Sequence, residues 1–407
     1  MFTLDDIQKD SGNDIVRIRV FGIGGAGNHV VSRMVAENTQ GITFVNINTD
    51  KHALAASAAD IKLQIGEKLT KGQGAGSDPS LGRKSAEESR NNIIKLFDDT
   101  DIAFFTAGMG GGTGTGAISV ISELARECGV LTVGVVTKPF KFEGARKLAV
   151  AEAGITELLK KVDTLIVIPN ENLRLVSPQK VTLVNAFGIA DGILRDAVTH
   201  IAQLLRSTGN INLDFADLRT ILRGSGYAHM GIGAGSGHYM VDEAVAQAAE
   251  NKLMESSIRD ARRILLQVIG SPDITLDDVE ALADKFREYA NSDANIIFGF
   301  EIDDKLDDEL RVVVIATDFG TGKPQMINRD SENDIIPAPE YRKPPVTVPD
   351  YRTPYNPPYN PPPANTSYDF DPIPAPYFPP EPDLYTDLAP DTSGGDDDWD
   401  AILKIFK

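Results

Sequence analysis

Apolar and polar positions alternate between two periods along the first 170 residues. Short apolar runs, each bounded by Gly, Asn or Asp, predict strands at 15–21, 42–47, 102–106, 130–136 and 164–168. Between several of them, apolar residues recur every three or four positions, which predicts helices such as 28–37 and 117–127. Strands that alternate with helices indicate an α/β fold, a doubly wound parallel sheet covered on both faces.

A long helical pattern follows, and the character of the chain then changes. An apolar stripe predicts one helix over 178–206. Apolar runs at 230–234, 263–269, 295–300 and 310–316 predict further strands, with helices at 243–253 and 276–289. The pattern predicts a first domain over 14–177 after a disordered segment 1–13, a central helix, and a smaller α+β domain over 207–320.

The last part of the chain lacks apolar periodicity and is crowded with proline. Residues 321–395 combine Pro with Tyr, Asn and Asp, a composition that buries no core, so we expect a disordered acidic linker. In 396–407, Trp399, Ile402, Leu403 and Phe406 share one helical face. A frayed end is the alternative, but an apolar face beyond a tether favours a partner-binding peptide.

Composition narrows the classes of function. The 407 residues carry a net charge of −19, which argues against nucleic acid and anionic membranes as direct partners. The single cysteine, Cys128, allows no disulfide within the chain and fits a reducing cytosol. No signal peptide and no apolar run of about 20 residues occur, so we expect a cytoplasmic protein without direct membrane insertion.

A glycine-rich loop at 110–116 (GGGTGTG) carries the strongest chemical signal. It follows a predicted strand and opens a predicted helix. Because glycines leave no Cβ in the way, several backbone amides can converge on one anion, and the helix adds the positive end of its dipole. We interpret the loop as a phosphate site rather than a flexible turn.

A second loop at 22–28 (GIGGAGN) raises a competing hypothesis. It fits G-x-G-x-x-G between a strand and a helix, and Asp50 follows at the spacing of a dinucleotide fold. An NAD-dependent oxidoreductase is therefore an alternative. A dinucleotide fold needs one such loop, however, whereas this chain has a third at 72–76 (GQGAG) and no Walker A sequence. Loops at one sheet edge favour a triphosphate held by backbone amides.

Together these segments resemble a known family. Loop 110–116 is similar to the signature loop of the tubulin superfamily. Segments 24–28, 74–76, 137–144, 168–170 and 212–217 (NLDFAD) occur in the order seen in the FtsZ family of bacterial cell-division GTPases. The resemblance covers about residues 14–318. It implies GTP and GDP as ligands, Mg²⁺ on the phosphates, and head-to-tail polymers of the cell-division ring, at midcell.

The resemblance also implies roles for individual residues. Those expected to contact the nucleotide are Gly24, Gly25, Ala26, Gly27, Asn28, Ala75, Gly76, Gly112, Thr113, Gly114, Glu143, Lys147, Asn170, Phe187 and Asp191. Ala75 and Gly76 are expected beside the γ-phosphate and Glu143 on the ribose. Lys147 stands where the family commonly has arginine and lacks the bidentate fork, which leaves Arg146 as an alternative. Phe187 would stack on guanine while Asp191 accepts its N1 and 2-amino hydrogens. The spacing alone favours a core ring and a solvent charge, and only the resemblance reverses this.

The same resemblance makes Asn212, Asp214 and Asp217 catalytic. From Phe187 to residue 206 a helix rises about 30 Å, so these carboxylates do not reach the nucleotide of their own subunit. A head-to-tail neighbour would bring them to the γ-phosphate, where they orient water. A GTP-binding filament that barely hydrolyses is the other alternative. The terminal peptide keeps an acidic, then apolar, then basic order but lacks the family's proline and arginine; membrane-anchor and regulatory division proteins are its expected partners.

Overall fold

The computed structural model describes residues 16–36, 41–176, 181–182, 185–204, 214–251, 253–254, 257–291 and 293–319. All of them lie in one compact unit, Met1–Ser331. The predictions for 1–13, for the linker and for the terminal peptide fall outside the described residues, as does Asn212.

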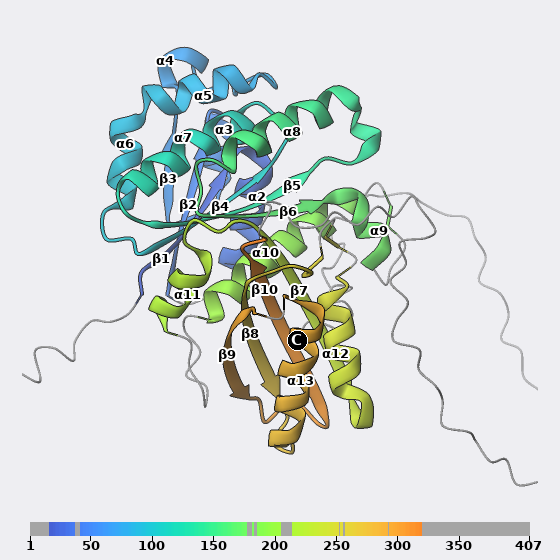
Figure 1. The fold of residues 1–407 in the computed structure, drawn as a ribbon. Coiled ribbons are helices and arrows are strands. Elements are labelled where there is room, and N and C mark those ends of the chain that lie inside the picture. Colours follow the sequence, from blue (N-terminus) through green and yellow to red (C-terminus); the bar gives the residue numbers. More distant parts are fainter. Residues whose placement is uncertain are drawn as a thin grey trace, which may run out of the picture. The chain divides into compact units, whose positions relative to one another are not determined.

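Six parallel strands form the first part of the sheet, in the order β3-β2-β1-β4-β5-β6 (Figure 1). Their bounds are β1 Ile18–Ile23, β2 Ile42–Asn48, β3 Ile61–Gln64, β4 Ile102–Gly108, β5 Leu131–Lys138 and β6 Thr164–Pro169. The five strands expected from apolar runs are present. The short edge strand β3 has the sequence IKLQ, which carries no apolar run to reveal it.

Helices cover both faces of this sheet, which confirms the doubly wound fold. On one face, α2 (Gly24–Ala36) and α10 (Ala186–Leu204) pack over Ile18 and Val20 of β1. On the other, α7 (Thr113–Glu127) and α8 (Ala145–Leu158) pack over Phe21 and Ile23. The alternation of β1 side chains between the two cores is the period of two expected of a strand. The remaining helices of this part are α3 Lys51–Ala55, α4 Glu67–Thr70, α5 Pro79–Glu88, α6 Arg90–Ile94 and α9 Leu173–Val176.

The long helix is shorter than its sequence pattern suggested. Val181 and Thr182 are not helical, and α10 begins at Ala186. Thr182 and Asn185 form a reciprocal turn in which the Thr182 amide donates to Asn185 Oδ1 at 2.7 Å and the Asn185 amide to Thr182 Oγ1 at 3.3 Å. Such side-chain to backbone hydrogen bonds compete with helical hydrogen bonds, so the helix begins only after this turn. Helix α11 (Phe215–Leu222), which the pattern did not reveal, follows residues outside the description.

The second part of the sheet continues through β7 (Gly226–Ser236), which pairs in parallel with β6 at its first two residues and antiparallel with β10 (Glu309–Thr317). Strands β8 (Arg263–Gly270) and β9 (Asn295–Ile302) complete it, and α12 (Met240–Ala249) and α13 (Leu276–Tyr289) cover one face. Strand β7 is longer than expected because glycines interrupt its apolar pattern. A Cβ on Gly231 would lie 1.9 Å from the Ala248 carbonyl oxygen, so these glycines admit α12 against the strand.

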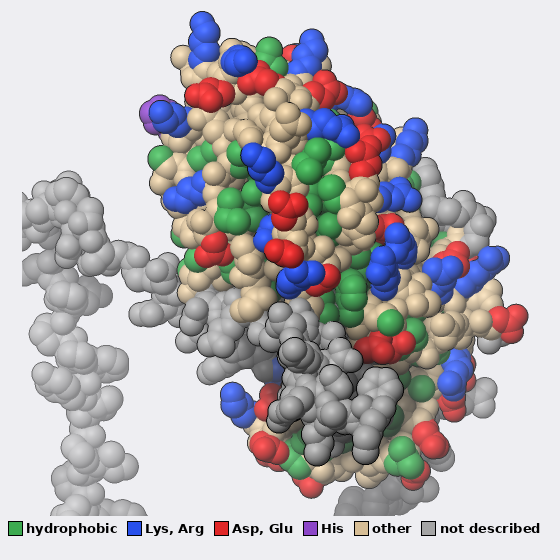
Figure 2. Space-filling model, turned by 90° about the vertical axis from the view of Figure 1, so that its left-hand side faces the viewer, with side chains coloured by type: hydrophobic (Ala, Val, Ile, Leu, Met, Phe, Trp, Pro, Cys, Tyr) green, Lys and Arg blue, Asp and Glu red, His purple; other side chains and the backbone are tan. Residues whose placement is uncertain are grey.

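The described surface mixes charges of both signs. Acidic and basic side chains are interspersed over the face shown in Figure 2. No helix in the described part of the chain has the length and apolarity needed to span a membrane.

Candidate functional site

A cavity of about 280 Å³ opens where β1, β4, β5 and β6 end. Its walls include residues of the glycine loops 22–28 and 110–116 and of segments 137–144 and 168–170, but none of loop 72–76. The residues that line it are Ile23, Gly25, Ala26, Gly108, Met109, Gly111, Gly112, Thr113, Gly114, Thr137, Pro139, Glu143, Lys147, Asn170, Phe187, Ala190 and Asp191. Ligands of open parallel sheets bind at this edge, so the cavity is the candidate site.

The first wall is the start of α2, which follows β1 without an intervening loop. Gly24 has a φ of +73°, and a Cβ there would lie 2.8 Å from the Gly114 amide nitrogen. A Cβ on Gly27 would lie 2.3 Å from the Thr106 carbonyl oxygen. These two glycines let α2 approach β4 and α7, while Gly25 and Ala26 face the cavity. Glycine is thus needed here for close approach of backbones.

Asn28 lies beneath this wall and is only 3% exposed. Its Nδ2 donates to the Gly22 carbonyl at 2.7 Å, and its Oδ1 accepts from Asn48 Nδ2 at 2.8 Å. Asn28 is not among the residues that line the cavity, and these bonds tie α2 to β1 and β2. The expected nucleoside contact of Asn28 stays a prediction.

The second wall is the start of α7, which provides backbone donors. Gly112 is the N-cap residue and has no side-chain capping bond. Gly112, Thr113 and Gly114 line the cavity, and the Thr113 hydroxyl lies 2.7 Å from that of Thr49. The first amides of a helix lack helical acceptors and lie at its positive end. An anion such as phosphate satisfies both.

The loop at 72–76 lies behind this wall. A Cβ on Gly112 would lie 3.0 Å from the Cβ of Ala75, and the Gly74 amide donates to the Thr49 carbonyl at 3.3 Å. Gly76 has a φ of +54° with open space around it. Ala75 and Gly76 are not among the residues that line the cavity, but they stand next to the start of α7, which does line it.

The other end of the cavity combines aromatic rings with a buried carboxylate. The Phe187 ring is 47% exposed and meets Phe140 edge to face at 5.6 Å between ring centroids. One turn along α10, the Asp191 carboxylate is 13% exposed and lies 3.9 Å from Arg33 Nε. Burial raises the pKa of Asp191, and the positive charges of Arg33 and His29 partly oppose this shift.

Phe140, Arg33 and His29 are neighbours that the sequence interpretation missed. Phe140 follows Lys138 and Pro139 at the end of β5. The sequence identified segment 137–144 as part of the family resemblance but indicated no role for this ring. Arg33 lies on α2 and meets Asp191 only through the packing of two distant helices. Only tertiary structure reveals such a pair.

Glu143 and Lys147 form an ion pair in the cavity wall. Glu143 also accepts a hydrogen bond from the Phe140 amide at 2.9 Å, so its carboxylate is fixed. Arg146 is exposed and is not among the lining residues, whereas Lys147 is. Across the cavity, Asn170 is 5% exposed and its buried Oδ1 has no partner among the described residues. A buried acceptor without a partner is costly, which suits a ligand that donates to it.

The predicted catalytic carboxylates lie elsewhere. Asp214 caps the N-terminus of α11, where its Oδ1 accepts from the Asp217 amide at 2.7 Å. Asp214 is exposed and Asp217 half-buried. The carbonyl of Leu222, the last residue of α11, accepts from Thr164 Oγ1 at the amino end of β6 at 2.5 Å, and the Gly226 amide donates to the Asp163 carbonyl at 2.9 Å. Helix α11 therefore stands at the amino edge of the sheet, opposite the cavity.

A doubly wound sheet, with several glycine turns at one edge and a mostly buried carboxylate in the cavity beside them, is the arrangement expected of a nucleotide-binding protein of the tubulin class. Comparisons with known proteins agree. Residues 17–178 match the Tubulin/FtsZ family GTPase domain and residues 226–320 the FtsZ family C-terminal domain.

Solved structures give the same answer. An empty FtsZ dimer from M. jannaschii is 37% identical over 78% of this chain and 92% of that chain, with a TM-score of 0.70. A point mutant of FtsZ from M. jannaschii is 38% identical over 77% and 93%, with a TM-score of 0.69. A GTPgS-bound protofilament of CetZ2 from Haloferax volcanii shares the fold at 20% identity over 74% and 92%, with a TM-score of 0.62.

The chain belongs to the FtsZ family. It is a GTPase of the tubulin superfamily, a class of cytoskeletal proteins that bind guanine nucleotides.

Proposed function

We propose that this GTPase assembles head to tail into filaments and hydrolyses GTP at the junctions between subunits. One subunit would bind GTP in its cavity, and Asp214 and Asp217 of the next, with Asn212, would complete the site. Such a contact joins two different surfaces and leaves both ends of a row open, so it generates a filament.

The separation of the two sets of residues carries this proposal. The cavity lies at the carboxyl edge of the sheet and α11 at the amino edge. Helix α10, which bears Phe187 and Asp191, alone has 19 residues and a length of about 28 Å. Attack on phosphorus requires reacting atoms about 3–3.5 Å apart, so a single subunit does not bring them together.

Within the cavity, each wall suits one part of GTP. The amides of Gly25, Gly112 and Gly114 and the Thr113 hydroxyl suit the phosphates. Glu143, Lys147 and Asn170 Oδ1, which has no partner in the described part of the chain, suit the ribose and its surroundings. An ionised Asp191 suits the two hydrogen donors of guanine; adenine lacks them and would leave a buried carboxylate unpaired.

Magnesium is expected with the nucleotide. Among the described residues, no three His, Cys, Asp or Glu side chains gather to hold a metal. Mg²⁺ prefers phosphate oxygens and waters to a cage of side chains, so this wall of amides and hydroxyls fits the ion as a companion of GTP. It would neutralise charge on the phosphates.

The reaction would be an in-line displacement. The oxygen of a water molecule bonds to the γ-phosphorus while the bond to the bridging oxygen breaks and its electron pair stays on GDP. The water's protons leave with the inorganic phosphate and the solvent. Asp214 and Asp217 would orient this water, while the amides at the start of α7 stabilise the developing negative charge.

In the cell, we propose that these filaments form part of a cytoplasmic division ring at midcell. Family membership supports this role. The terminal peptide 396–407 would bind membrane-anchor and regulatory division proteins through its apolar face.

The test is the GTPase rate per subunit against protein concentration, with light scattering in parallel. We expect the rate to rise with assembly. An equimolar mixture of Asp214→Asn, which lacks the acidic group, and Asp191→Ala, which lacks the base acceptor, should regain turnover that neither has alone. A rate per subunit that is the same in dilute and concentrated protein would contradict the shared site.

A further inference from the structure

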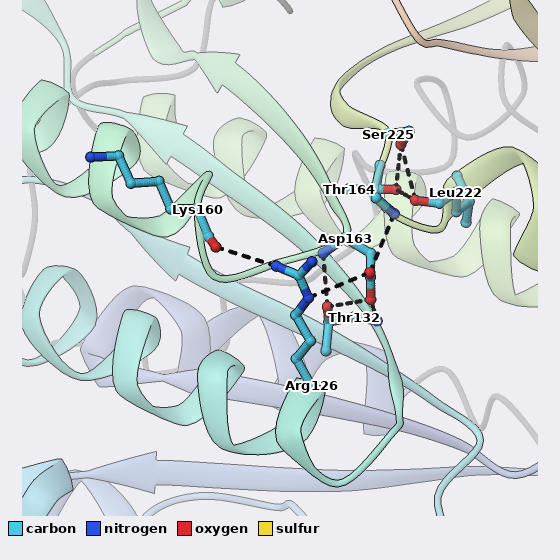
Figure 3. Close-up of polar contacts among 8 residues, drawn as sticks. Arg126, Thr132, Lys160, Asp163, Thr164, Leu222 and Ser225 are labelled. Carbon is cyan, nitrogen blue, oxygen red and sulfur yellow. Dashed lines mark hydrogen bonds and ion pairs between the residues drawn. The ribbon is translucent and has the colours of Figure 1, made fainter.

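Asp163, at the amino end of β6, holds three segments together at the sheet edge far from the cavity (Figure 3). Its side chain is 5% exposed. One oxygen, Oδ2, accepts from the amide and the hydroxyl of Thr132 on β5, at 3.0 and 2.8 Å. The other, Oδ1, accepts from the Gly224 amide at 3.3 Å and lies 3.8 Å from Arg126 Nε. Both carboxylate oxygens are therefore occupied.

The Gly224 side of this contact is the turn that ends α11. Leu222 is the last residue of α11, and its carbonyl is one of those that a helix leaves without a partner. It accepts from Thr164 Oγ1 at 2.5 Å and from Ser225 Oγ at 3.0 Å. Gly224 has a φ of +63° in the same turn. Asp163 and Thr164, consecutive residues of the GTPase domain, thus bind both the end of α11 and the turn after it (Figure 3).

Helix α11 is short, so a shift at this attachment would also reach its other end. Eight residues rise about 12 Å, and the N-cap of the helix is Asp214. Asp217 lies in its first turn. A small rotation at Leu222 would therefore move both carboxylates through a distance that matters for a reaction at phosphorus.

We propose that Asp163 and Thr164 are positioning residues for GTP hydrolysis. They set the start of α11 with Asp214 and Asp217, here called the acidic turn, in a fixed position on the GTPase domain of the same subunit. This inference rests on the proposed function, because Asp214 and Asp217 would act on the nucleotide of the next subunit. Neither Asp163 nor Thr164 touches the cavity. Their effect on the reaction would pass through α11.

A further contact relates the acidic turn to the nucleotide end of its own subunit. Arg126, beside Asp163, lies in the last turn of α7, the helix whose first residues Thr113 and Gly114 line the cavity. Arg126 Nη1 also donates to the Lys160 carbonyl at 3.3 Å. The contacts of Asp163 and Thr164 with α11 and the turn after it, here called the clamp, are thus connected to the helix whose start lines the cavity.

Two variants test the clamp. Asp163→Asn keeps the shape, but its amide group turns a donor toward the amide of either Thr132 or Gly224. Thr164→Val keeps the volume and removes the hydroxyl from the Leu222 carbonyl. Thr164→Ser restores that hydroxyl and serves as the rescue. Ile93→Val, a truncation in the buried core away from α11, is the control for lost stability alone.

Turnover is measured per assembled subunit, with assembly induced by GTP and quantified by sedimentation, and GDP affinity is measured in dilute protein. We expect Asp163→Asn and Thr164→Val to lose about tenfold to a hundredfold in turnover while GDP affinity stays within about twofold. Thr164→Ser and Ile93→Val should retain turnover. Unchanged turnover in both clamp variants, or a loss that Ile93→Val shares, would overturn the inference. If wild-type turnover does not rise with concentration, the proposed function fails first and the positioning role with it.

Discussion

The two edges of the parallel sheet differ in how their polar groups are paired. At the carboxyl edge, Gly112 starts α7 without a capping side chain and Asn170 Oδ1 has no partner among the described residues. At the amino edge, both oxygens of Asp163 and the last carbonyl of α11 are occupied by donors of the same chain. The first edge has polar groups available to a ligand, and the second uses its polar groups to hold a helix in place.

This contrast separates binding from chemistry. In the proposed function, the amides at the start of α7 would bind an anion whether or not another subunit is present, whereas the acidic turn at the opposite edge would act on the nucleotide of a neighbour. Damage to the carboxyl edge should therefore reduce nucleotide affinity. Damage to the amino edge should reduce turnover and leave the affinity of single subunits unchanged.

The largest effect is expected from Asp214→Asn. Asparagine caps helices as well as aspartate does and can still accept from the Asp217 amide, so α11 should persist. Loss of the carboxylate should lower kcat by about 10²–10⁴-fold, with unchanged GDP affinity. Steady-state phosphate release and fluorescent GDP titration measure the two quantities. Asp278→Asn, in the capping box of α13, is the matched control and should keep full activity. Equal loss of affinity and turnover would contradict the separation of the two edges.

A substitution at the carboxyl edge should do the reverse. Gly25 lines the cavity, and a Cβ there meets nothing within 4 Å, so Gly25→Ala should fold normally. A methyl group on this lining residue is expected to compete with phosphate for space and should weaken GDP binding by about tenfold or more. Gly192→Ala on α10, also with open space around its Cβ, is the control and should bind normally. Calorimetric titration measures the affinities, and a wild-type affinity for Gly25→Ala would remove the phosphate from this wall.

Much of this arrangement could be predicted from the sequence, for physical reasons that differ by element. Buried strands such as β4 and β5 have continuous apolar runs, and glycines that admit close backbone approach, as at Gly24 and Gly27, leave a compositional trace. Strand β3 and the start of β7 escaped because polar residues and glycines replace that run.

The rest of the site depends on contacts between residues far apart in the chain. Asp163 meets Gly224 across 61 positions, and Arg33 meets Asp191 through the packing of α2 against α10. Asn28 illustrates a second limit, because a motif does not tell an amide that faces a ligand from one that is bonded within the core.

A smaller effect should come from pH at the carboxyl edge. Burial raises the pKa of Asp191 above its usual value, against the charges of Arg33 and His29. Guanine needs the ionised carboxylate as acceptor, so binding is full above this raised pKa and weakens as pH falls through it, by up to about tenfold per pH unit. GDP affinity measured from neutral pH downward should show this loss. Asp191→Asn is the control, because the GDP phosphates titrate in the same way with both proteins. This variant should bind GDP weakly and lack the pH dependence that comes from Asp191. The same pH profile in both proteins would contradict the role of Asp191.

The smallest effect should be an acid-dependent loss of stability at the amino edge. Hydrogen bonds and the charge of Arg17 lower the pKa of Asp101, against the opposing effect of burial, with help from Arg219. Because the pKa is lower in the folded state, the ionised carboxylate stabilises the fold at pH values above the ordinary pKa of aspartate. This contribution is lost as the pH falls through the lowered pKa of the folded state. Both side chains are partly exposed, so solvent screens the pair, and Asp101→Asn should lower Tm at neutral pH by no more than about 2 °C. Thermal unfolding at several pH values should show the difference between wild type and variant vanish in acid. A loss of GDP affinity in Asp101→Asn would mean that the two edges are not independent, because this carboxylate lies at the opposite end of β4 from the cavity.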